Sequence, residues 1–150
     1  MPETVFSKLL HWQLPPEQES LALSRDIFLF SYCARGMAFV DIAFLRRDDI
    51  CGDWFSYVRR KTGQRLTVRI EPPMAAIINR YKNEAGEYVF PIISDDCQDA
   101  YRQYQTALGY HNRKLKQLAE IAGISEKLSP YTARHSWATA ARRHNVPLSI

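Results

Sequence analysis

Residues 54 to 70 have the pattern of a β-hairpin in the middle of a largely helical chain. Two β-rich runs, Trp54–Arg60 and Arg65–Ile70, flank the turn residues Lys61–Gln64, and the second run alternates polar with apolar side chains. A third, short strand is expected near Asp49–Cys51. Apolar residues at helical spacing lie on both sides of this hairpin. We therefore predict an α+β fold, mostly helical with a small antiparallel three-stranded sheet.

Helical segments make up most of the remaining chain, and glycines and prolines mark their limits. Residues 1–19 read as a lead-in segment, and one domain is expected over residues 20–150. Gly109 and Gly123 are interpreted as helix stops, and Tyr88–Ile92 as a short extended segment. The predicted helices span about 20–32, 38–46, 72–81, 95–108, 111–122 and a stretch that begins at 130.

Composition excludes several classes of protein. None of the apolar runs approaches the ~20 residues of a membrane helix, no signal peptide is recognisable, and we expect a cytoplasmic location with no membrane partner. Three cysteines without a Cys-x-x-Cys pair predict neither a disulfide framework nor a zinc site. The four histidines lack ligand spacing, so no metal is expected. A net charge of +4 with clustered arginines and lysines permits binding to nucleic acid.

Two separate arginines are candidates for binding a phosphate. Ser129 can cap a helix that begins at Pro130, and Tyr131 and Arg134 then share one face at its N-terminus, where an anion is favoured. A capped helix with one solvated arginine is the alternative interpretation. Arg35 is expected between two apolar helices, where a buried guanidinium needs a partner, either Asp41 or an anionic ligand.

Three blocks together resemble one known active site. Phe28–Asp41, Lys61–Gly63 and Ala133–Thr139 are similar to the catalytic domain of the tyrosine recombinases, or phage integrases, and particularly to integrases of Bacteroides-type mobile elements. The resemblance spans residues 20 to 150. It implies site-specific recombination of DNA through a 3′-phosphotyrosyl intermediate, with a double-stranded recombination site and other recombinase protomers as partners and with no cofactor.

The resemblance also implies roles for individual residues. Arg35 and Arg134 would clamp the scissile phosphate, since planar guanidinium groups match its oxygens. Lys61 at the tip of the hairpin would protonate the leaving 5′ hydroxyl as general acid. Tyr131 opens the second arginine box, where the family usually has histidine. Further contacts to DNA are expected from Arg59, Arg60, Arg65 and His135.

The nucleophilic tyrosine of the family follows the second arginine box. In this chain it would come after Ile150, so we expect an incomplete catalytic domain that is inactive by itself. The separate N-terminal DNA-clamping domain of the family has no counterpart in the sequence. The resemblance implies a bacterial protein, associated with the nucleoid when bound to DNA.

A helix–turn–helix regulator is the alternative function. Leu115–Ser125, followed by Leu128 and Ser129, has the spacing of that motif, in which Gly123 would allow the tight turn. Its second helix would meet Pro130 within a turn or two, too early to read bases. This alternative also leaves the hairpin and the Arg35 block unexplained.

Overall fold

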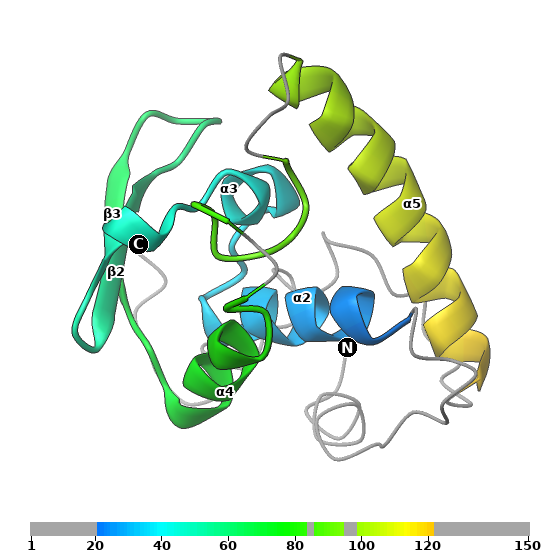
Figure 1. Ribbon diagram of the computed structural model, residues 1–150, viewed down its shortest axis with the longest axis horizontal. Helices are drawn as coiled ribbons and strands as arrows, with labels where there is room; N and C mark the ends of the chain where they lie inside the picture. Colours follow the sequence, from blue (N-terminus) through cyan, green and yellow to red (C-terminus); the bar gives the residue numbers. More distant parts are fainter. Residues whose placement is uncertain (1–20, 84–85, 95–98, 122–150) are drawn as a thin grey trace.

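The computed structural model describes residues 21–83, 86–94 and 99–121 (Figure 1). Within these ranges the chain forms four α-helices, one 3-10 helix and a three-stranded antiparallel sheet, which confirms the α+β prediction. Two helices, α2 and α3, come before the sheet in the sequence, and α4 and α5 come after it. The elements are α2 (Ala22–Cys33), α3 (Phe39–Ala43), η2 (Arg47–Asp49), β1 (Ile50–Cys51), β2 (Trp54–Val58), β3 (Arg65–Arg69), α4 (Pro72–Arg80) and α5 (Ala100–Ile121).

The sheet has the order β1-β2-β3, and the register of β2 and β3 separates its two faces. Phe55 pairs with Val68 and Tyr57 with Leu66, so these side chains share one face. Three of the four are buried and Tyr57 is partly buried. The other face is largely exposed. The sheet therefore covers the core with one face only, as expected of a small antiparallel sheet.

Phe30 of α2 lies at the centre of the core. Its side chain is fully buried, stacks on Phe55 of β2 with ring centroids 5.7 Å apart, and meets Phe90 edge-on at 5.1 Å. Phe90 belongs to residues 86–94, which form turns and bends. The prediction of an extended segment over Tyr88–Ile92 was therefore wrong. An isolated bridge between Arg46 and Tyr88 holds this turn against the start of η2.

A buried carboxylate joins α2 to α4. Asp26 accepts hydrogen bonds from Tyr81 Oη and Arg80 Nη1, both at 2.5 Å, and also contacts the Arg25 guanidinium at 3.2 Å. The Asp26 side chain is 2% exposed, whereas the Arg80 side chain is 48% exposed. A buried charge is tolerated because several donors surround it.

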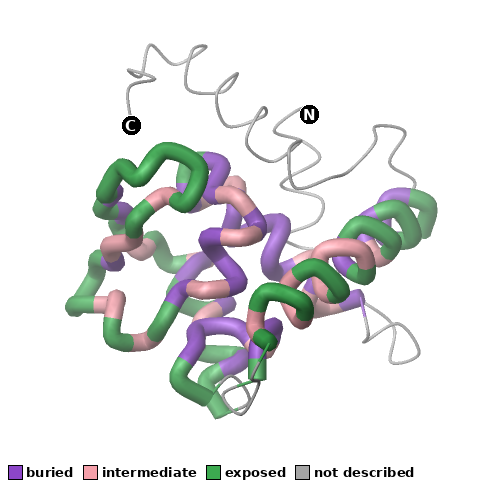
Figure 2. The backbone as a smooth tube through the Cα atoms, turned by 90° about the horizontal axis from the view of Figure 1, so that it is seen from above, coloured by how far each residue is buried: buried purple, intermediate pink, exposed green. Residues whose placement is uncertain are grey.

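Helix α5 runs without interruption through Gly109, so the predicted helix stop at this residue was wrong. Gly109 costs a helix interior only about 1 kcal/mol relative to alanine. Tyr104 and Ala107 before it are partly buried against the core, and His111, Leu115 and Leu118 after it are buried. The His111 ring stacks on Phe39 of α3 at a centroid distance of 4.7 Å. Figure 2 shows buried positions recurring along one side of this helix.

None of the described helices is both long and apolar enough to cross a membrane.

Candidate functional site

Arg35 lies in the tight turn between α2 and α3. Its backbone is left-handed, with φ 63°, and Gly36 follows with φ 75°. Ser31 stabilises the turn, because its carbonyl accepts the Gly36 N–H at 2.8 Å and its hydroxyl donates to the Met37 carbonyl at 2.6 Å. A left-handed arginine is strained, and such strain is often found at functional positions. The conformation turns the chain sharply at the end of α2.

The Arg35 side chain is exposed, and the expectation of a buried guanidinium was wrong. Helices α2 and α3 are largely buried, as expected. Arg35 lies in the turn that joins them, where its side chain can point to solvent. Within the described residues, Arg35 has neither an ion pair nor a side-chain hydrogen bond. Its charge is therefore open to an anionic ligand from solution.

Asp41, the other predicted partner of Arg35, instead contacts the hairpin. The buried Asp41 carboxylate accepts the backbone N–H of Arg60 at 3.1 Å. Burial raises the pKa of Asp41, while the Arg60 N–H and the positive charges of Arg60 and Arg59 oppose that rise. Asp41 thus holds the hairpin at the residue before Lys61.

Lys61 is exposed in the turn that joins β2 to β3, as predicted. The turn is closed by hydrogen bonds from the Arg59 N–H to Gln64 O at 2.8 Å and from the Gly63 N–H to Arg59 O at 2.7 Å. Gly63 has φ 73°, a conformation that suits glycine. The turn is fixed at its base while the Lys61 side chain remains free to reach a ligand.

Three of the predicted DNA-binding residues converge on one pocket of about 420 Å³ at the base of the hairpin. Arg59, Arg60 and Arg65 line it together with Asp41 and Tyr57. Burial, followed by the Asp41 charge, raises the pKa of Tyr57 to about 12, so this phenol is un-ionised at neutral pH. The remaining lining residues are Phe44, Leu45, Arg46, Asp49, Ser56, Val58 and Gly63.

The charges of this pocket are only partly balanced by protein groups. The Arg60 guanidinium lies 4.0 Å from the centroid of the Phe44 ring. Arg46 forms an ion pair with Glu87 at 2.8 Å. In the described part of the chain, Arg59 and Arg65 have no ion pair. The lining of the pocket holds four arginines, Arg46, Arg59, Arg60 and Arg65, against two carboxylates, Asp41 and Asp49, so its net charge is positive.

Sequence reasoning missed the contribution of η2 to this pocket. Arg46 and Asp49 reach it because the Arg46 N–H donates to Asp49 Oδ2 at 3.0 Å, which closes a short 3-10 turn beside β2. The adjacent acids Asp48 and Asp49 were visible in the sequence as a charge cluster. Nothing in their spacing indicated that they approach the hairpin.

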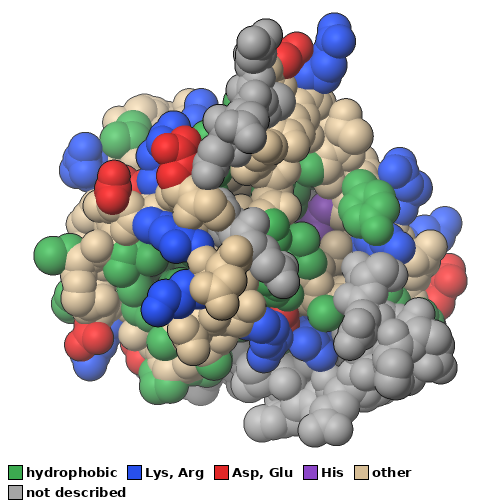
Figure 3. Space-filling model, viewed as in Figure 1, with side chains coloured by type: hydrophobic (Ala, Val, Ile, Leu, Met, Phe, Trp, Pro, Cys, Tyr) green, Lys and Arg blue, Asp and Glu red, His purple; other side chains and the backbone are tan. Residues whose placement is uncertain are grey.

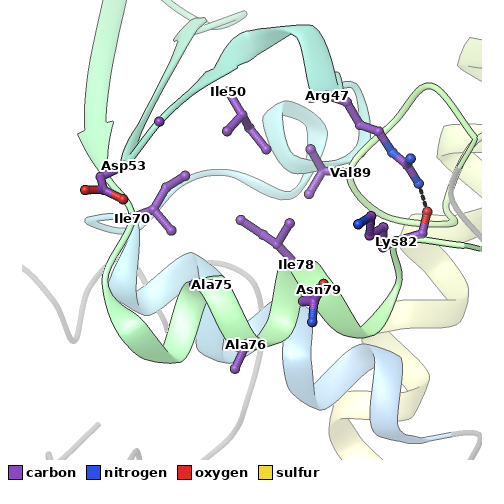
Figure 4. A pocket seen from close by; sticks show the side chains of 11 residues that line it. Arg47, Ile50, Asp53, Ile70, Ala75, Ala76, Ile78, Asn79, Lys82 and Val89 are labelled. Atoms are coloured by element: carbon purple, nitrogen blue, oxygen red, sulfur yellow. Dashed lines mark hydrogen bonds between the residues drawn. The ribbon is translucent and has the colours of Figure 1, made fainter.

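A larger pocket, of about 690 Å³, lies between α4 and the sheet (Figure 4). Its middle is aliphatic, with Ile50, Ile70 and Ile78 around it. Arg47 is at one end, where its guanidinium donates to the backbone carbonyls of Lys82 and Tyr88. None of the predicted site residues lines this pocket. Its size alone does not make it the phosphate site.

Tyr131, Arg134 and His135 lie outside the described residues, so the second arginine box stays a prediction. The turn and the second helix of the proposed helix–turn–helix lie there too. Among the described residues, no cluster of histidine, cysteine or acidic side chains could hold a metal ion. Figure 3 shows basic side chains spread over the viewed face of the molecule, both on the sheet side and on the α5 side.

Solved structures share this fold over nearly the whole chain. XerA recombinase matches with a TM-score of 0.64 at 17% identity over 98% of this chain and 52% of its own. A lambda integrase (residues 75–356) dimer bound to a COC′ core site matches with 0.64 at 14% identity over 97% and 53%. The lambda integrase catalytic core matches with 0.59 at 14% identity over 93% and 80%.

The comparisons confirm the predicted tyrosine recombinase catalytic-domain fold. The chain spans about half the length of the first two of these structures. No family model matches the sequence, and no curated protein matches it. The narrower resemblance to Bacteroides-type integrases stays a prediction.

Proposed function

We propose that this chain is part of a site-specific DNA recombinase that cuts and rejoins DNA by phosphoryl transfer to a tyrosine. The observation that carries the proposal is the placement of Arg35 and Lys61 within this fold. Both are exposed in turns on either side of α3, and α3 itself holds the hairpin through Asp41. Two separate sequence blocks of the predicted site are thus linked by one short helix.

The proposed chemistry uses Arg35 and Arg134 to neutralise the nonbridging oxygens of the scissile phosphate. When a tyrosine oxygen attacks phosphorus, negative charge builds on these oxygens, and two guanidinium groups stabilise it. The bond to the 5′ oxygen breaks, and Lys61 supplies the proton for that leaving group. Tyr131 would contact the same phosphate. No metal is needed for any of these steps.

The proposed substrate is duplex DNA, held by other protomers as well as by this one. The lambda integrase structure with a related fold is a dimer on a core site. Arg59 and Arg65 at the base of the hairpin have no ion pair with any of the described residues, and they provide positive charge on the same hairpin as Lys61. Contacts to phosphates would supply most of the affinity without reading sequence.

DNA binding measured by fluorescence anisotropy across a salt series tests this function. We expect Arg35→Ala, Lys61→Ala and Arg134→Ala each to weaken binding and to reduce its salt dependence by about one ion per contact. Lys82→Ala, which removes an exposed charge beside the larger pocket, is the matched control. Unchanged binding by the three variants would refute the shared phosphate site. Loss of binding only on substitution within Ser125–Leu128 would favour the helix–turn–helix regulator.

A further inference from the structure

The solvent-facing side of the sheet carries an arginine, Arg69, and an aromatic ring, Trp54, that the predicted site leaves unused. In the register of β2 and β3, Trp54 lies opposite Arg69 and Val58 opposite Arg65. Trp54 and Val58 are each 48% exposed, which is high for large apolar side chains. We call this the outer sheet face; its six residues are Trp54, Ser56, Val58, Arg65, Thr67 and Arg69.

We propose that the outer sheet face is a second DNA-backbone contact, in which Arg65 and Arg69 bind phosphates and Trp54 packs against a deoxyribose. This inference rests on the proposed function and extends it beyond the hairpin turn. It assigns roles to Arg69 and Trp54.

The charge of this face supports a polyanion as its occupant. None of its six residues is acidic. Neither Arg65 nor Arg69 has an ion pair or side-chain hydrogen bond within the described residues. The nearest carboxylates along the chain lie outside this face. Asp53 comes immediately before β2, and Glu71 comes two residues after Arg69. Unpaired arginines that are held at a fixed spacing suit a phosphate backbone.

The geometry of the strands sets the spacing of the two arginines. Arg69 comes four residues after Arg65 in the extended strand β3, so their Cα atoms are about 13 Å apart. This distance corresponds to roughly four base-pair rises of DNA at 3.4 Å each. The central pair on this face, Ser56 and Thr67, is joined through its hydroxyl groups at 3.0 Å. The side chains at the centre of this face are therefore short and uncharged. They leave room for a DNA backbone to approach both arginines.

The outer sheet face is continuous with the candidate site. Ser56, Val58 and Arg65 line the pocket at the base of the hairpin as well as belonging to this face. A duplex whose phosphate enters that pocket beside Arg65 would pass next along β3 toward Arg69. The flat indole of Trp54, opposite Arg69, would meet the sugar between successive phosphates.

Two measurements on the full chain test this contact. Binding of a fluorescein-labelled duplex of arbitrary sequence is followed in a potassium chloride series for the parent, Arg69→Gln, Arg65→Gln and the control Lys82→Ala. We expect each arginine variant to lose about three- to tenfold in affinity and to lower the salt slope by about one. The control should keep both values near those of the parent. Arg69→Lys, which retains the charge, should recover most of the slope.

Tryptophan fluorescence supplies the second measurement. Addition of unlabelled duplex should change the emission of the parent, and Trp54→Phe should remove a distinct part of that change. If the parent binds duplex DNA while Arg69→Gln matches Lys82→Ala and Trp54→Phe leaves the emission change intact, the outer sheet face is not a DNA contact. If the parent shows no salt-dependent DNA binding at all, the proposed function itself fails. Circular dichroism confirms that each variant is folded.

Discussion

The carboxylate of Asp41 accepts the backbone N–H of Arg60 at 3.1 Å, so helix α3 holds the hairpin one residue before Lys61. This bond joins two segments that are 19 residues apart in the sequence. It replaces the pairing with Arg35 that the sequence left open. The acid of the first arginine block thus positions the lysine of the second block, and Arg35 stays available to solvent.

Two substitutions of Asp41 should distinguish the contribution of its hydrogen bond to stability from that of its charge. Asp41→Ala leaves the Arg60 N–H without an acceptor and should lower the free energy of unfolding by about 1–3 kcal/mol. Asp41→Asn retains an oxygen acceptor and should stay within about 0.5 kcal/mol of the parent at neutral pH, since burial raises the pKa of Asp41 and disfavours its charge. Urea unfolding measures both values. Equal losses for the two variants would show that the charge matters more than the hydrogen bond.

Replacing Arg35 with glycine should move stability and DNA affinity in opposite directions. Arg35→Gly relieves a left-handed backbone at φ 63° and should raise the free energy of unfolding by about 0.5–1 kcal/mol. The lost guanidinium should weaken DNA binding. Arg35→Ala is the control, because it removes the same charge but keeps the strain. A gain in stability for alanine as well as for glycine would contradict the backbone explanation.

His111 should make the protein sensitive to acid. Burial lowers the pKa of His111 to about 4, and its Nδ1 atom has no hydrogen-bond partner among the described residues. The unfolded chain takes up this proton near pH 6.5, so stability is complete above that pH and falls as the pH drops toward 4, by on the order of 3 kcal/mol.

His111→Phe retains the ring that stacks on Phe39 but cannot titrate. The difference in the free energy of unfolding between this variant and the parent should therefore grow from pH 7 to pH 4. Thermal unfolding followed by circular dichroism at several pH values gives this difference. A constant difference over that range would show that His111 is not the titrating group.

Asp26 should be the most sensitive polar position in the core. Asp26→Ala removes the shared partner of Arg80 and Tyr81 and should cost about 2–3 kcal/mol, because the buried Tyr81 hydroxyl loses its acceptor while the half-exposed Arg80 can turn to water. Tyr81→Phe removes one donor only and should cost about 1 kcal/mol. Guanidinium unfolding compares them. Similar losses for the two variants would mean that the Tyr81 hydroxyl carries most of the network.

Gly109→Ala should stabilise the protein by about 0.5–1 kcal/mol, since Gly109 is in the interior of a regular helix. An added methyl group would meet only Arg113 Nη1, at 3.6 Å, which is an ordinary contact with a flexible side chain. Gly63→Ala is the contrasting control and should destabilise, because that residue has φ 73°. A loss of stability for Gly109→Ala would indicate a break in α5.

The hairpin and the exposed Lys61 were predictable because turn residues and alternation act locally. The helix α2 and the proline start of α4 were predictable for the same reason. The register was not predicted: β2 ends at Val58, which pairs with Arg65, two residues before the predicted end of the strand at Arg60. Helix α5 was predicted as two helices because Gly109 resembles a helix stop, and its continuity depends on core packing of residues on both sides of Gly109. The partner of Asp41 could not be predicted, because its contact with the Arg60 N–H depends on tertiary packing and not on the local sequence.

The arrangement around Phe30 determines which parts of the domain can open separately. Its ring contacts the sheet through Phe55 and the 86–94 turn through Phe90, so neither can detach from α2 without exposing it to water. The amide protons of Phe55 and Val68 should then exchange with solvent only when the whole domain unfolds. The amides of Lys61 and Thr62 lie at the tip of the turn, outside the hydrogen bonds that close it, and should exchange quickly. The Phe30 ring thus makes the sheet and the 86–94 turn open together with α2, whereas the tip of the hairpin can open by itself.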